Sequence, residues 1–135
     1  MTSPTSVRKV MHEKLEKILE DKTAQEAALK MSIVNTSSLI ATDLKEKPVG
    51  IITERDLVRS VVANDAYSKT VLIKHIMASP ITTIDANSSV EAAADLMLQN
   101  KVRHLLVVEN EDINKPLGII TSTDFTSYLI GDEKE

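Results

Sequence analysis

Two short motifs, each pairing a hydroxyl with a carboxylate, hold the residues of this chain best suited to chemistry. Thr53 and Asp56 form the first motif, and Thr121 and Asp124 form the second. A carboxylate can accept two hydrogen bonds from the diol of a ribose. A motif lying where a strand leads into a helix also places free backbone N–H groups within reach of a phosphate. One interpretation of the motifs is therefore a site for a sugar phosphate.

The same spacing also has a purely structural interpretation. In a capping box, a threonine just before a helix accepts a hydrogen bond from the third backbone N–H of the helix, and an acidic side chain at that third position accepts one in return. A sequence match to this pattern is a hypothesis and no more. The two interpretations are compatible, and the residues alone leave both open.

Both motifs end a segment that occurs twice. Lys47–Asp56 reads KPVGIITERD and Lys115–Asp124 reads KPLGIITSTD, with seven of the ten positions identical. The similarity extends upstream, where Ala27, Ala28 and Met31 match Ala93, Ala94 and Met97. Such self-similarity indicates a duplicated unit. We predict one repeat over residues 1–66 and another over 67–135, which complete each other's core because a unit this small is marginal alone.

The elements that position the motifs follow the same order in both copies. For the first copy, the pattern predicts strands at 17–18, 38–44 and 47–52, with helices over 23–34 and 54–64. For the second, it predicts a helical turn at 73–77, strands at 81–84, 104–108 and 116–121, a polar turn at 109–115, and a last helix over 122–130. The helix between the first two of these strands begins at Ser88, with Glu91 completing a capping box. The order β-α-β-β-α predicts an α+β fold.

The composition excludes several classes of function. The chain has no cysteine, which excludes disulfides and thiolate metal sites and fits a cytoplasmic protein. A net charge of −4 and the scarcity of aromatic residues argue against nucleic acid as a partner. No segment is apolar over the 18 residues that a membrane span needs. Residues 1–4 lack the pattern of a secretory signal, so none is expected.

The residue pattern does not resemble that of an enzyme. Neither His12, His75 nor His104 has a carboxylate at metal-ligand spacing. A phosphate-binding loop of the Walker type and a Gly-x-Ser-x-Gly elbow are both missing from the sequence. Asp56 and Asp124 fall in separate copies, so they do not form an acid–base pair. We therefore predict a binding protein that has no metal site, needs no cofactor and does no catalysis.

The chain resembles a known protein family. The unit order, the Gly-Ile-Ile-Thr-x-x-Asp endings and the Ala-Ala-x-x-Met helices resemble the CBS domain, named after cystathionine β-synthase, and two in tandem resemble a Bateman module. The resemblance implies a stand-alone CBS-domain protein whose two repeats are related by a pseudo-two-fold axis and packed through their sheets. It also implies a regulatory or sensor module that binds AMP, ADP or ATP in the cleft between the repeats. Homodimers and a protein partner are further expectations, and a ligand-free scaffold acting through dimerisation or partner binding is the alternative.

The resemblance also implies two sets of binding residues. The stronger site is expected to use Asp124, Thr121, Thr123, Ile119, Arg103 and His104 with Lys17, Ile18 and Thr36 from the first copy. The weaker site is expected to use Asp56, Thr53, Ile51, Ile81, Thr82 and Lys101. The ranking rests on basic residues at 101–104, where the first copy has Asn35–Ser38.

Each of these residues also has a simpler interpretation. Buried isoleucines are more often core than ligand wall, Arg103 can be a surface side chain, and Arg55 an exposed partner of neighbouring acids. Gly50 and Gly118 are expected to let a ligand approach the backbone. Apolar residues after the motifs are expected to form a dimer surface, with packing inside the chain as the alternative: Leu57, Val58, Val61, Val62, Phe125, Leu129 and Ile130.

Overall fold

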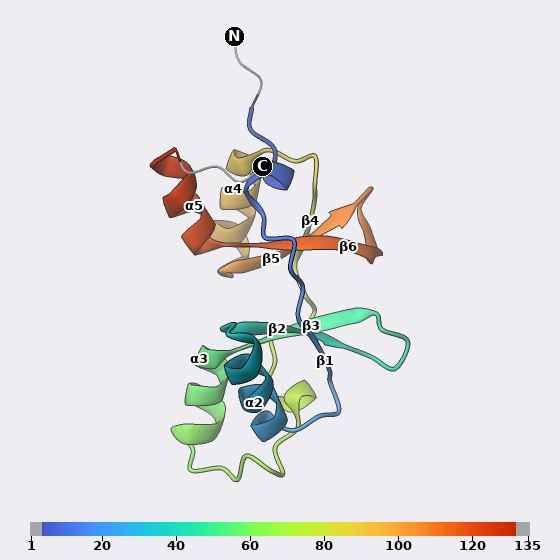
Figure 1. The fold of residues 1–135 in the computed structure, drawn as a ribbon, viewed down its shortest axis with the longest axis vertical. Helices are drawn as coiled ribbons and strands as arrows, with labels where there is room; N and C mark the ends of the chain where they lie inside the picture. Colours follow the sequence, from blue (N-terminus) through green and yellow to red (C-terminus); the bar gives the residue numbers. More distant parts are fainter. Residues whose placement is uncertain (1–3, 132–135) are drawn as a thin grey trace. The chain divides into compact units, whose positions relative to one another are not determined.

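A computed structural model describes residues 4–131 and divides the chain into two compact units (Figure 1). The middle unit is Glu16–Ile81. The terminal unit combines the stretch up to Leu15 with the stretch from Thr82 onward. These units differ from the repeats predicted at 1–66 and 67–135, because each takes a short helical segment from the other copy. Residues 1–3 and 132–135, including most of the segment inspected for a secretory signal, lie outside the described residues.

The middle unit is a three-stranded sheet with its helices on one face. Its elements are β1 (Lys17–Leu19), α2 (Ala24–Val34), β2 (Ser38–Thr42), β3 (Pro48–Thr53), α3 (Glu54–Leu57), the π-helical turn η1 (Val58–Val62) and the 3₁₀ turn η2 (Ile73–His75). The strand order is β1-β2-β3, with β1 parallel and β3 antiparallel to β2. The predicted β-α-β-β-α order and the α+β class are confirmed for this unit.

The terminal unit repeats this architecture. It contains α1 (Val7–Val10), β4 (Thr83–Asp85), α4 (Val90–Asn100), β5 (His104–Glu109), β6 (Asp112–Thr121) and α5 (Ser122–Leu129). The strand order is β4-β5-β6, again with one parallel and one antiparallel pair. Figure 1 shows α4 and α5 on one face of this sheet, as α2 and α3 lie on one face of the other.

Each unit has a hydrophobic core of its own. The middle core is formed by Ala27, Met31, Leu39, Ala41, Ile52 and Ile73. The terminal core is formed by Val7, Val10, Met11, Ile84, Ala86, Val90, Ala93, Met97, Leu105, Val107 and Ile120. The predicted Ala-Ala-x-x-Met helices supply one alanine and the methionine to each core. Because burial of apolar surface is the main stabilising contribution, the repeated apolar pattern explains the repeated architecture.

The exchanged segments are integral to both cores. Val7, Val10 and Met11 come from the chain start and are buried in the terminal core. Ile73 follows the first copy's last helix and lies in the middle core next to the half-buried Met77. Each segment ends in an antiparallel bridge, formed by His12 with Ile119 in one unit and by Ala78 with Ile51 in the other.

Two predicted boundaries are wrong. The N-cap of α4 is Ser89, whose hydroxyl accepts a hydrogen bond from Ala92 at 3.0 Å, rather than Ser88. The chain start explains the shift, because the Ser88 carbonyl accepts a hydrogen bond from the Val7 N–H at 2.8 Å.

The polar turn predicted at 109–115 is also shorter than expected. Glu109 pairs with Asp112, and only Asn110 and Glu111 form the hairpin loop, with φ of 51° and 61°. Positive φ at both positions is typical of a two-residue hairpin turn. Strand β6 therefore begins at Asp112, four residues before the predicted start, and the other boundaries lie within two residues of the predictions.

Candidate functional site

The first motif places the Asp56 carboxylate at the start of α3. Thr53 donates to Oδ2 of Asp56 through its backbone N–H at 2.9 Å and through its hydroxyl at 3.0 Å. The Asp56 N–H donates back to the Thr53 hydroxyl at 3.3 Å, which confirms the capping box. Within residues 4–131, no hydrogen bond reaches Oδ1 of Asp56, and the residue is half-buried. One carboxylate oxygen is therefore fixed and the other is available to a ligand.

The second motif holds Asp124 in the same way but adds a further partner. Thr121 donates to Oδ2 of Asp124 from its backbone N–H at 2.8 Å and from its hydroxyl at 3.3 Å. On the other oxygen, Oδ1, the His12 ring nitrogen Nε2 lies at 2.5 Å. The Asp124 side chain is 4 % exposed, whereas that of His12 is 42 % exposed. Both oxygens of Asp124 therefore have partners within the terminal unit.

The difference between the motifs comes from the exchanged segments. His12 and Ala78 occupy matching places, since each forms the antiparallel bridge to the isoleucine that follows the motif glycine. The histidine side chain reaches the nearby carboxylate, and an alanine has no polar atom to do so. His12 lies outside both motifs and was not among the predicted site residues, although the alignment that matches Ala27 with Ala93 also places His12 opposite Ala78.

The two motif glycines serve the chain itself. A Cβ atom on Gly50 would lie 2.7 Å from Sδ of Met77 and 2.8 Å from the Ala78 carbonyl oxygen. One on Gly118 would overlap the His12 carbonyl oxygen and approach Sδ of Met11 at 2.9 Å. The expectation that these glycines leave room for a ligand is therefore wrong, because the exchanged segments fill that space.

Several residues predicted for the Asp124 site gather in the terminal unit. His104 pairs with Thr121 and Leu106 pairs with Ile119 across β5 and β6. The Arg103 carbonyl accepts a hydrogen bond from the Ser122 N–H at 3.0 Å, so the entrance of β5 lies beside the start of α5. Arg103 and Thr123 are exposed, as a residue that meets a phosphate must be.

The other predicted residues divide between the units. Of the residues predicted for the Asp56 site, Thr53, Ile51 and Ile81 lie with Asp56 in the middle unit, whereas Thr82 and Lys101 belong to the terminal unit. Of the Asp124 set, Lys17, Ile18 and Thr36 belong to the middle unit. Lys17 and Ile18 line a groove between β1 and α2, and Lys30 donates to the Lys17 carbonyl there.

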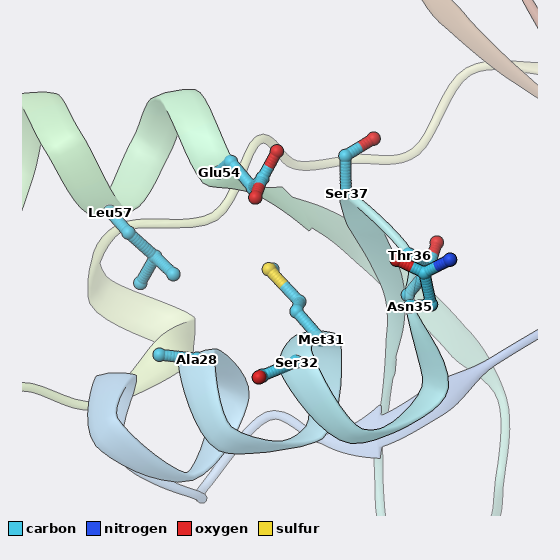
Figure 2. Close-up of a pocket in the computed structure, with 8 residues that line it drawn as sticks. All are labelled: Ala28, Met31, Ser32, Asn35, Thr36, Ser37, Glu54 and Leu57. Atoms are coloured by element: carbon cyan, nitrogen blue, oxygen red, sulfur yellow. The ribbon is translucent and has the colours of Figure 1, made fainter.

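A pocket of about 530 Å³ lies between the end of α2 and the start of α3 (Figure 2). It is lined by Ala28, Met31, Ser32, Asn35, Thr36, Ser37, Glu54 and Leu57. Figure 2 shows the Met31 side chain extending from α2 with its sulfur directed toward Glu54 at the start of α3. Because its only charged lining residue is acidic, this pocket can take polar groups but does not attract a phosphate. Among its residues, Thr36 alone was predicted as a site residue.

Two kinds of feature are missing from the part of the chain that the structure describes. There, histidine and acidic side chains do not form a group of three or more that could hold a metal ion. None of the helices over residues 4–131 has the length and apolar character needed to cross a membrane.

Comparisons with known proteins agree with this architecture. The model of the CBS domain matches residues 7–63 and 73–131. An uncharacterized protein of Methanopyrus kandleri is 35% identical over 116 residues, which are 84% of this chain and 58% of that protein. Inosine-5'-monophosphate dehydrogenase of Methanocaldococcus jannaschii is 35% identical over 104 residues, which are 77% of this chain and 19% of that enzyme.

The solved structures extend the likeness to the fold. The hexameric CBS-CP12 protein from bloom-forming cyanobacteria is 26% identical, with a TM-score of 0.83 over 95% of this chain and 71% of that one. Both family matches include a β-α-β-β-α unit with its Thr-x-x-Asp motif. The chain therefore belongs to the CBS domain family, and it carries two CBS domains in tandem.

Proposed function

We propose that this chain is a regulatory module that binds an adenine nucleotide (AMP, ADP or ATP) with the ribose diol on Asp56. The observation that carries the proposal is the state of the Asp56 carboxylate. Its Oδ2 is held by the Thr53 N–H and hydroxyl at 2.9 and 3.0 Å, and its Oδ1 accepts no hydrogen bond from the described residues. A carboxylate fixed in this way is preorganised for a ligand, which lowers the entropy cost of binding.

The energetics favour a diol as the group that binds there. Hydrogen bonds to a charged group contribute about 1.5–3 kcal/mol each. A ribose offers two adjacent hydroxyls, so one carboxylate supplies a useful fraction of the roughly 5–8 kcal/mol that corresponds to affinities between sub-millimolar and micromolar. The apolar Ile51 precedes Thr53 by two residues and is 8% exposed, so a small part of its side chain is accessible for apolar contact with a base.

The phosphates need a positive partner, and Arg55 is the nearest cation along the chain. Arg55 is exposed and forms no ion pair with the residues that the structure describes. Its guanidinium can therefore turn to a phosphate without breaking an existing interaction. Because Arg55 directly precedes Asp56, ribose and phosphate contacts would come from one turn of helix.

The proposed output is regulation of a partner or of self-association, with no chemistry on the nucleotide. The inosine-5'-monophosphate dehydrogenase relative matches this chain over only 19% of its own length, so the matching part accompanies a much larger remainder. In the present chain, the two carboxylates belong to separate motifs, each engaged in its own capping arrangement. Binding without turnover is the role that this arrangement supports.

Calorimetric titration of the chain with AMP, ATP, NADH and S-adenosylmethionine tests the proposal. At a nucleotide concentration of about 100 times Kd, binding should also stabilise the fold by roughly 2.7 kcal/mol. The matched control is Asp56→Asn, which keeps one carbonyl oxygen for Thr53 but places an amide NH₂ where the diol needs an acceptor. We expect this variant to keep its thermal midpoint and to lose at least tenfold in affinity.

Two results would count against the proposal. Equal affinities of Asp56→Asn and the wild type would place the ribose elsewhere. No heat and no thermal shift with any of the four ligands would favour the alternative, a ligand-free CBS scaffold that acts through dimerisation or partner binding.

A further inference from the structure

We infer that His12 is a latch on the second motif, so that the chain has one open carboxylate, Asp56, and one closed carboxylate, Asp124. This inference rests on the proposed function, because it concerns which motif accepts the nucleotide. It reverses the order of strength predicted from the basic residues at 101–104. The latch is a single side chain that occupies the atom a ribose would need.

The backbone of His12 is fixed next to the motif. Its N–H donates to the Ile119 carbonyl at 2.8 Å, and its carbonyl accepts from the Ile119 N–H at 2.9 Å. From this anchored position, Nε2 approaches Oδ1 of Asp124 at 2.5 Å. The acceptor is a carboxylate, so Nε2 carries the proton and donates. The closed state therefore contains a charge-assisted hydrogen bond, one of the stronger kinds in proteins.

The latch can open without unfolding the unit. The His12 side chain is 42 % exposed, and only its ring contacts the carboxylate, whereas its backbone remains paired with Ile119. Rotation about the side-chain bonds would move the ring into solvent and free Oδ1. The Asp124 side chain, at 4 % exposure, has little access to water while the ring is in place.

The other motif supplies an internal comparison. Ala78 forms the matching pair with Ile51, at 2.9 and 3.0 Å, and is exposed. With the same backbone arrangement and no ring, Oδ1 of Asp56 accepts no hydrogen bond from residues 4–131. Oδ1 thus has a hydrogen-bond partner in the unit that has a histidine at this place, and none among the described residues in the unit that has an alanine there.

Both hydroxyls of a diol need the two acceptor positions of Oδ1, and the His12 ring takes one of them. A nucleotide at Asp124 must therefore displace the ring before both hydroxyls can bind. The loss of a hydrogen bond to a charged group lowers affinity by at least tenfold. The chain should therefore bind one nucleotide at Asp56 first and fill Asp124 only at much higher concentration. Because the two sites differ in affinity, nucleotide binding should increase gradually over a wide range of concentration.

Calorimetric titration of the full chain with AMP tests the latch through two reciprocal variants. His12→Ala gives the second motif the side chain found at the first, and we expect the number of tight sites to rise from one to two. Ala78→His places a ring opposite Asp56, and we expect the wild-type site to weaken by at least tenfold. Because Ala78 is exposed, this variant removes no core contact and remains informative if His12→Ala is poorly folded.

Asn variants of the two carboxylates assign the sites. Asp124→Asn in the His12→Ala background should return the count to one, and Asp56→Asn in the wild type should remove the tight site. Two equal sites in the wild type, or one unchanged site in both latch variants, would overturn the latch and leave nucleotide binding in place. If neither the wild type nor any variant binds AMP or the other three ligands, the proposed function itself fails.

Discussion

His12 and Ile119 exchange both of their backbone hydrogen bonds, with N···O distances of 2.8 and 2.9 Å. This pair ties the chain start to the edge strand β6, shortly before the strand ends at Thr121. Ala78 and Ile51 form the equivalent pair in the middle unit. Each Thr-x-x-Asp motif therefore has a neighbouring segment that comes from the other sequence copy, and the identity of that segment decides whether the carboxylate is open.

The close approach of these segments predicts that Gly118→Ala destabilises the terminal unit. The added methyl would overlap the His12 carbonyl oxygen, which is a backbone atom held by Ile119 and cannot easily move. Overpacking of this kind typically costs about 1–3 kcal/mol. Urea denaturation followed by circular dichroism measures the loss.

Gly50→Ala provides the graded comparison. There the nearest atom is the Sδ of Met77, the far end of a flexible side chain, at 2.7 Å, and the Ala78 carbonyl oxygen follows at 2.8 Å. We expect a smaller loss than for Gly118→Ala. Equal or reversed losses would mean that the exchanged segments do not press on the two glycines as described.

The two carboxylates should also differ in their contribution to stability. Asp56→Ala removes a capping partner and should cost about 1 kcal/mol. Asp124→Ala removes a capping partner and the bond to His12 as well, so a loss of about 2–3 kcal/mol is expected. Denaturation of the wild type, His12→Ala, Asp124→Ala and the double variant gives the coupling free energy between the two side chains through a double-mutant cycle. A coupling energy of zero would show that the His12–Asp124 contact contributes nothing to the fold.

A capping box at the start of α2 predicts a measurable pKa. The Thr23 N–H and hydroxyl donate to Oε1 of Glu26 at 3.3 and 3.1 Å, and the Glu26 N–H donates to the Thr23 hydroxyl at 3.2 Å. The hydrogen bond from the Thr23 backbone N–H, and to a smaller extent those from the Thr23 hydroxyl and Lys22, hold the pKa of Glu26 below its ordinary value. The resulting stabilisation is present above the ordinary glutamate pKa of about 4.3 and is lost as the pH falls through the lower folded value.

Nuclear magnetic resonance titration of Glu26 tests this prediction directly. Thr23→Ser keeps the hydroxyl and should leave the pKa of Glu26 depressed, whereas Thr23→Ala removes only the hydroxyl donor, so the pKa should rise part of the way while the backbone N–H still lowers it. The loss of the cap should cost about 1 kcal/mol of stability. A Glu26 titration that is the same in all three proteins would exclude the Thr23 hydroxyl as a contributor to the lowered pKa.

Much of each unit could be predicted from the sequence because the signals are local. Apolar residues at helical spacing gave α2 and α4, and the KPxGIIT segments gave the strands that lead to the motifs. The Thr53 capping box was also predictable, since its partners are three residues apart. These features depend on residues close together in the sequence, and because the unit is duplicated, each pattern occurs twice.

The features that escaped prediction depend on contacts between distant segments. Ser89 rather than Ser88 caps α4 because the chain start pairs with Ser88. The role of His12 depends on a contact with a residue at the far end of the chain. The hairpin at Asn110 and Glu111 escaped for a different reason, since neither residue is the glycine that a positive φ usually requires.

The placement of Arg55 predicts a contribution that depends on the phosphates of the ligand. Arg55→Ala should weaken ATP binding by about tenfold or more, because a hydrogen bond to a charged group is lost. Binding of adenosine, which has no phosphate, should be nearly unchanged. Arg59→Ala is the matched control, since this arginine is also exposed and lies one helical turn further from the motif. Equal losses for ATP and adenosine would assign Arg55 a role other than phosphate contact.

Exposed apolar side chains after both motifs predict self-association of the chain. Val62 on η1 is 72% exposed and Leu129 on α5 is 81% exposed, whereas Val61 is buried and does not belong to this surface as predicted. Light scattering should give twice the mass of one chain, and Val62→Glu with Leu129→Glu should reduce it to a single chain, because burying unpaired carboxylates is costly. Leu44→Glu is the control, because Leu44 is 82% exposed and belongs to the loop between β2 and β3 rather than to a helix. A single-chain mass for the wild type, or dissociation by Leu44→Glu alone, would exclude these helix faces as the contact.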